Sequence, residues 1–145
     1  MKKIIATGTL LLVVGTFLGV GQKAAAAPTM KKKWVEQVAP PASRVTESVK
    51  IYAKYEITAH GWPKAQWQCL NKLWTKESNW RHLAKNRSSG AYGIPQALPA
   101  EKMASAGKDW KTNPFTQVDW GLKYIISRYK TPCGAIGHWN LKGWY

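Results

Sequence analysis

Two neighbouring stretches, Glu77–Trp80 (ESNW) and Arg87–Pro99 (RSSGAYGIPQALP), decide how this chain is interpreted. Apolar residues recur at spacings of three and four over Pro63–Trp80, which predicts a helix with one apolar face, and the acid of the first stretch continues that face. The second stretch is a loop in which Gly90 and Gly93 can adopt positive φ or let a ligand come close to the backbone. The sequence therefore predicts a lone carboxyl group at the end of an apolar helix, beside a loop whose backbone a ligand can approach.

The rest of the chain also favours helices. No segment shows the sustained alternation of apolar and polar residues that a half-buried strand requires, and there is no internal repeat. We therefore expect a mainly α-helical single domain over residues 47–145. Helical spacing predicts further helices from Glu47 to the turn at Gly61–Pro63, around Pro99–Ala106, over Pro114–Tyr129 and over Cys133–Asn140.

The first 26 residues are typical of a secretory signal peptide. Lys2 and Lys3 form a positive start, the run Ile4–Val20 is apolar, and Ala24–Ala26 offers a small-residue cleavage site. We expect cleavage after Ala26. An uncleaved membrane anchor is the alternative, because the run is close to the shortest length that spans a bilayer.

Residues 27–46 have the composition of a basic, proline-containing linker. The run Lys31–Lys33 and the pair Pro40–Pro41 lie among few residues that could build a core. Cleavage after Ala26 removes three lysines and no acid, so the net charge falls from +15 to +12. A charge of this size attracts polyanions. Outside a bacterial cell these are teichoic acids, anionic lipid heads and the wall itself, and no nucleic-acid recognition motif is present.

An exported chain with two cysteines is expected to form a disulfide, here between Cys69 and Cys133; two buried free thiols are the alternative. Two cysteines without a matching pair of histidines do not favour a zinc site. We expect no metal and no cofactor. The three histidines are interpreted as surface or packing residues: His60, His82 and His138.

The two opening stretches resemble the Glu-Ser … Gly-Ala-x-Gly-Leu-Met-Gln-x-x-Pro signature of the lytic transglycosylase and goose-type lysozyme superfamily, with Ile94-Pro95 where Leu-Met is commoner. More closely still, the chain resembles small secreted transglycosylase-like proteins of Gram-positive bacteria, from about Trp67 to Tyr145. This resemblance implies a lysozyme-like fold. It also implies that Glu77 is both the general acid and the general base of a reaction on peptidoglycan.

A glycosidic acid must keep its proton near neutral pH, and burial against apolar side chains has that effect by penalising the charged form. Glu77 next to Leu73 and Trp74 fits this requirement; a surface pair with Arg81 is the alternative. Most glycosidases use two carboxylates, and no second acid of this chain falls in a site motif. Lytic transglycosylases need only one, because the sugar's own 6-hydroxyl attacks and a 1,6-anhydro product forms.

The resemblance extends to groups that bind substrate. Ser78 belongs to the first motif, and the amide of Gln96 can pair with an acetamido group. Tyr124 lies in a run similar to the family's Asn-Ile-x-x-Gly-x-x-Tyr-Leu motif. Trp139-Asn140 stands where the last motif has Tyr-Asn, so a hydroxyl is lost. Nine tryptophans exceed the needs of so small a core. We expect Tyr92 and Trp139 in the groove and Trp67 and Trp74 in packing.

The sequence thus predicts a secreted, wall-associated, monomeric lytic transglycosylase that cleaves the β-1,4 bond between N-acetylmuramic acid and N-acetylglucosamine. One alternative is a hydrolase on the same scaffold, similar to goose-type lysozymes or to resuscitation-promoting factors. The other is a non-catalytic protein that binds the wall or promotes aggregation.

Overall fold

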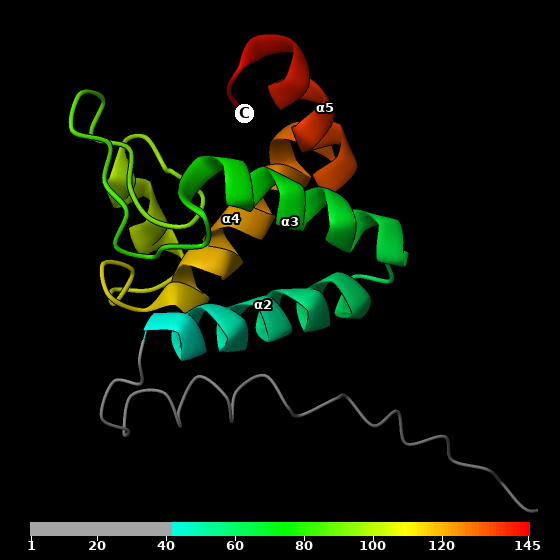
Figure 1. The fold of residues 1–145 in the computed structure, drawn as a ribbon, viewed down its shortest axis with the longest axis horizontal. Helices are drawn as coiled ribbons and strands as arrows, with labels where there is room; N and C mark the ends of the chain where they lie inside the picture. The colour runs from blue at the N-terminus through cyan, green and yellow to red at the C-terminus, as the bar shows by residue number, and fades with distance from the viewer. Residues whose placement is uncertain (1–41) are drawn as a thin grey trace, which may run out of the picture.

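The computed structural model describes residues 42–145, which form a mainly α-helical single domain (Figure 1). The described part contains five helices and no sheet; its only strand-like pairings are isolated bridges from Tyr92 to Lys85 and to Ala97. The predicted signal peptide and most of the predicted linker lie outside the described residues. The helices are α2 (Ala42–Ala59), α3 (Lys64–Ser78), the 3-10 helix η1 (Ala100–Ser105), α4 (Pro114–Tyr129) and α5 (Pro132–Lys142).

Helix α2 begins at Ala42, five residues before the boundary expected at Glu47. The extra turn forms because Val45 is buried on the same face as Val49 and Tyr52, at spacings of four and three. The Tyr52 hydroxyl donates a 2.6 Å hydrogen bond to Asp119 of α4. Residues 42–46 therefore belong to the folded domain and not to the linker.

Helix α3 supplies the centre of the core, with Leu70, Leu73 and Trp74 fully buried. It ends at Asn79, whose φ of 51° is left-handed and whose N–H donates to the Thr75 carbonyl at 3.0 Å. Trp80 is also left-handed, with φ 61°, and its buried ring meets Trp74 edge-on at 5.1 Å. The two left-handed residues turn the chain back toward the core and start the loop that follows α3.

Helix α4 has the bounds that the sequence predicts. Asn113 caps it by accepting a hydrogen bond from the Phe115 N–H at 2.9 Å, and Pro114 occupies the first turn. Gly121 lets α4 approach α3 closely: a Cβ at that position would lie 2.6 Å from the Trp74 ring. In Figure 1, α4 crosses behind α3, with α2 along one side of the pair and α5 on the other.

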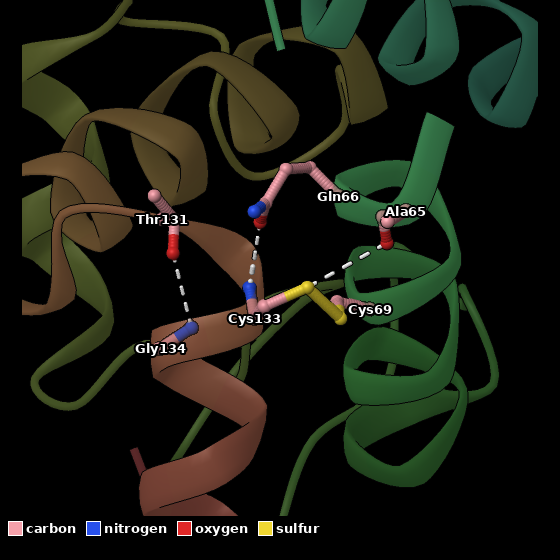
Figure 2. The surroundings of a disulfide bond; sticks show 6 residues. All are labelled: Ala65, Gln66, Cys69, Thr131, Cys133 and Gly134. Atoms are coloured by element: carbon pink, nitrogen blue, oxygen red, sulfur yellow. Dashed lines mark hydrogen bonds between the residues drawn. A yellow bond between two sulfur atoms is a disulfide. The ribbon is translucent and has the colours of Figure 1, made fainter. Parts of the chain in front are cut away.

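The predicted disulfide is confirmed. Cys69 on α3 and Cys133 on α5 are bonded, with their Cα atoms 4.9 Å apart (Figure 2). The Gln66 side chain also crosses between the helices and accepts a hydrogen bond from the Cys133 N–H at 2.9 Å. Thr131 caps α5 by accepting from the Gly134 N–H. One covalent bond and one hydrogen bond thus fix the start of α5 against α3.

No helix between residues 42 and 145 combines the length and the hydropathy that crossing a membrane requires. The packing predictions are confirmed for two tryptophans: Trp74 is fully buried, and Trp67 packs against the core. A second, smaller cluster beside η1 joins Met103, Ala97 and Trp110.

Candidate active site

Glu77 lies in the last turn of α3 and is half-buried. It follows Leu73 by four residues and Trp74 by three, so it extends the buried face of the helix, as the sequence predicts. Burial raises the pKa of the Glu77 carboxyl group, and a weaker opposing effect comes from a hydrogen bond with the Trp139 side chain. Glu77 therefore keeps its proton to higher pH than an exposed glutamate does.

Glu77 opens onto a groove of about 390 Å³, which we call the Glu77 groove. Its walls come from the end of α3, the loop after α3, the middle of α4 and the residues after α5. Among the described residues, Glu77 has the sole side-chain carboxylate in the groove lining, and no lysine or arginine lines it. The lining residues are Glu77, Asn86, Ala91, Pro95, Gln96, Leu98, Tyr124, Gly143, Trp144 and Tyr145.

The loop between α3 and η1 is held at its base by the buried amide of Gln117 on α4. This side chain is fully buried; it accepts from the Ile94 N–H at 2.9 Å and donates to the His82 and Trp110 carbonyls. Gly93 has φ 77°, and a Cβ there would lie 2.5 Å from the Gln117 side-chain oxygen. Only glycine fits this position. Gln117 lies within the α4 motif of the sequence, but polar residues on a helix give no sign of burial, so its role was not predicted.

Two of the predicted binding residues line the Glu77 groove. Gln96 lies there with φ 50°, and its amide nitrogen donates to the carbonyls of Gly93 and Ala84. Tyr124 lies on the α4 side, with its ring stacked on Trp120 at 5.3 Å. Both residues therefore line the Glu77 groove together with the acid.

Trp139 contacts Glu77 without lining the groove. The Trp139 side chain lowers the pKa of the Glu77 carboxyl group, and Lys76 Nζ lies 4.1 Å from the centre of its ring. Its indole N–H thus supplies a hydrogen-bond donor for the acid.

The other three predicted binding residues lie elsewhere. Ser78 is buried, and its hydroxyl donates to the Ile94 carbonyl at 2.9 Å, which ties α3 to the loop. Asn140 is exposed on α5 and is absent from the groove lining. Tyr92 lines a second hollow, of about 420 Å³, where its hydroxyl donates to the Lys111 carbonyl at 2.8 Å.

The second hollow differs from the Glu77 groove in charge. Its lining includes two lysines, Lys85 and Lys111, together with Trp110 and the exposed Glu101. Leu98 lines both hollows, so they are neighbours on one surface.

Trp144 and Tyr145 are groove residues that the sequence did not reveal. The Tyr145 hydroxyl accepts from Trp74 Nε1 at 2.8 Å and donates to the Pro95 carbonyl at 3.1 Å. Burial raises the pKa of Tyr145 well above its ordinary value. The two residues follow the last recognisable motif, and contacts over such sequence separations leave no local pattern.

Within residues 42–145, no group of three His, Cys, Asp or Glu side chains is arranged to hold a metal ion. The three histidines take surface or packing positions: His60 is exposed, and His82 and His138 are half-buried.

No protein-family model, curated protein or solved structure matches the chain.

Proposed function

We propose that this chain is a lytic transglycosylase on a lysozyme-like helical domain, and that it cleaves the N-acetylmuramic acid–β-1,4–N-acetylglucosamine bond of peptidoglycan. The observation that carries the proposal is the position of Glu77. It is half-buried, it has a raised pKa, and it opens onto a groove of about 390 Å³.

In the proposed reaction, Glu77 gives its proton to the glycosidic oxygen as the bond from that oxygen to the anomeric carbon breaks. The 6-hydroxyl oxygen of the same muramic residue then bonds to the anomeric carbon, and its proton passes to Glu77. The products are a free 4-hydroxyl on N-acetylglucosamine and a 1,6-anhydro sugar, and Glu77 is protonated again. A single side-chain carboxylate suffices, which agrees with a groove whose described lining holds one acidic side chain.

The groove also offers groups for the acetamido side chains of the substrate. The amide nitrogen of Gln96 is already engaged with backbone carbonyls, so its oxygen would accept the acetamido N–H. Asn86 and the Tyr124 ring line the same space. These residues would orient the sugar, and Trp139 would orient Glu77.

We further propose that the protein acts outside the cell as a monomer associated with the wall. The Cys69–Cys133 disulfide fits an oxidising compartment. The excess of 22 basic residues over 7 acidic ones favours contact with teichoic acids.

The experiment that tests the proposal is digestion of purified peptidoglycan by the chain from residue 27, with mass spectrometry of the glycan fragments. Fragments with 1,6-anhydro ends are expected. Fragments with reducing ends would indicate a hydrolase instead of a transglycosylase. The absence of fragments would favour a wall-binding protein without turnover. The Glu77→Gln variant is the matched negative control.

A further inference from the structure

We propose that Trp144 is a carbohydrate-binding residue, whose indole face stacks on a neutral pyranose ring of the glycan in the Glu77 groove. The inference deepens the proposed function and rests on it for the choice of polymer.

The first step is the exposure of apolar surface at the groove. Of the exposed large hydrophobic side chains in the described part, two line this hollow: Leu98, which is 55% exposed, and Trp144, which is 54% exposed. Exposed apolar side chains that gather in one groove are found at ligand-binding sites. A sugar ring combines an apolar face with polar edges, which matches an indole face next to Glu77 and Gln96.

The second step is that the residues on both sides of Trp144 are anchored before any ligand arrives. Helix α5 ends with Gly143, whose φ is 78° and whose N–H donates to the Trp139 carbonyl at 2.7 Å. On the other side of Trp144, the Tyr145 hydroxyl is bonded to Trp74 and to Pro95. The His138 ring contacts Trp144 edge-on, with ring centres 4.7 Å apart. Anchored neighbours and the contact with His138 limit the conformations open to Trp144, so less conformational entropy is lost on binding.

The third step concerns the charge of the ligand. The lining of the Glu77 groove contains no lysine or arginine among the described residues, whereas the neighbouring hollow has Lys85 and Lys111. A phosphate-rich polymer would favour the neighbouring hollow. The part of the Glu77 groove beside Trp144 therefore fits an uncharged N-acetylated hexose.

The test is binding of a β-1,4-linked N-acetylglucosamine tetramer, measured by calorimetry in the Glu77→Gln background, where turnover does not interfere. Trp144→Ala should weaken binding roughly fivefold to tenfold, since an aromatic contact contributes about 1 kcal/mol. Trp144→Phe, which keeps an aromatic face, should recover most of the affinity. The matched control is Leu141→Ala, because Leu141 is 83% exposed on α5 and does not line the groove.

Unchanged binding by Trp144→Ala would overturn the inference, as would equal losses in Trp144→Ala and Leu141→Ala or no binding by the Glu77→Gln protein. Equal melting temperatures show that any loss is local. Binding that depends on Trp144 in a protein whose wild type cuts no wall would remove the proposed reaction and leave this inference standing. If the wild-type protein cleaves walls but Trp144→Ala does not change binding of the tetramer, the proposed reaction stands and this inference fails.

Discussion

The Trp139 side chain of α5 lowers the pKa of the Glu77 carboxyl group of α3. The effect favours the charged carboxylate, because an indole N–H can only donate a hydrogen bond. Burial has the opposite and larger effect. The pKa of Glu77 therefore depends on both α3 and α5, the two helices that the disulfide joins.

Trp139→Phe removes this donor and keeps a smaller aromatic ring, so the pKa of Glu77 should rise further. A general acid works only while protonated, and activity is lost as pH rises through its pKa. The alkaline limb of the pH–rate profile should therefore move to higher pH. Trp62→Phe, at a tryptophan packed on the core and absent from the groove lining, is the control. A limb that stays in place or moves to lower pH contradicts the assigned contact.

Glu77→Gln keeps the size and polarity of the side chain and removes its titratable proton. We expect glycan cleavage to fall by at least about a hundredfold, in line with the loss of general acid–base catalysis. Wall binding should survive. Glu101→Gln is the matched control, because Glu101 is an exposed acid in the neighbouring hollow. Retained turnover in Glu77→Gln, or an equal loss in both variants, would remove Glu77 from the reaction.

Gln117→Leu is expected to lower the free energy of unfolding by about 3 kcal/mol or more. The change leaves one buried N–H and two carbonyls without their partner, at about 1–3 kcal/mol each. Urea denaturation measures the loss. Gln68→Leu makes the same substitution at an exposed position on α3 and should cost little. A small effect at Gln117 would mean that the loop does not depend on this amide.

Reduction of Cys69–Cys133 should lower the free energy of unfolding by about 4 kcal/mol, as the chain-entropy model gives for a loop of this length. The intact mass of the non-reduced protein should lie two hydrogens below the all-thiol value. Reductant should leave the melting temperature of a Cys69→Ala/Cys133→Ala protein unchanged. Full thiol labelling of the native protein without reductant would show that the bond is absent.

Attachment to walls should weaken as salt rises, because the Debye length is only about 8 Å at physiological ionic strength. Cleavage of short neutral glycan fragments should change little, since no lysine or arginine lines the Glu77 groove in the described part. Co-sedimentation with walls, before and after teichoic-acid removal, measures the first quantity. Equal salt dependence in both assays would show that the net positive charge of the protein does not attach it to walls.

Helices were predictable where their signals are local. For α4, Asn113-Pro114 marks the start and apolar residues at helical spacing mark the inner face, so both bounds agree. The sequence predicts the start of α2 five residues too late. A single buried residue, Val45, decides the first turn, and the change in composition near Glu47 does not reveal it. The position of Glu77 on a buried face followed from spacing alone.

The groove was only partly predictable, because spacing shows which face a residue occupies but not what packs against it. Ser78 and Tyr92 belong to the same motif as Glu77, yet one is turned into the core and the other into the neighbouring hollow. Tyr145 reaches Trp74 over 71 residues of sequence. Such a contact exists only once α5 has packed on α3.

The loop after α3 is divided into a constrained base and a permissive tip, with consequences for how the sequence can evolve. At the base, Gly93 has φ 77° and a Cβ there would meet the Gln117 side-chain oxygen, so Gly93 cannot be replaced while Gln117 is present. At the tip, the Asn86 side chain accepts from Ser88 and Ser89, and Arg87 is exposed. Natural variation and laboratory libraries should therefore accumulate at residues 87–89, beside the second hollow, while the base stays fixed.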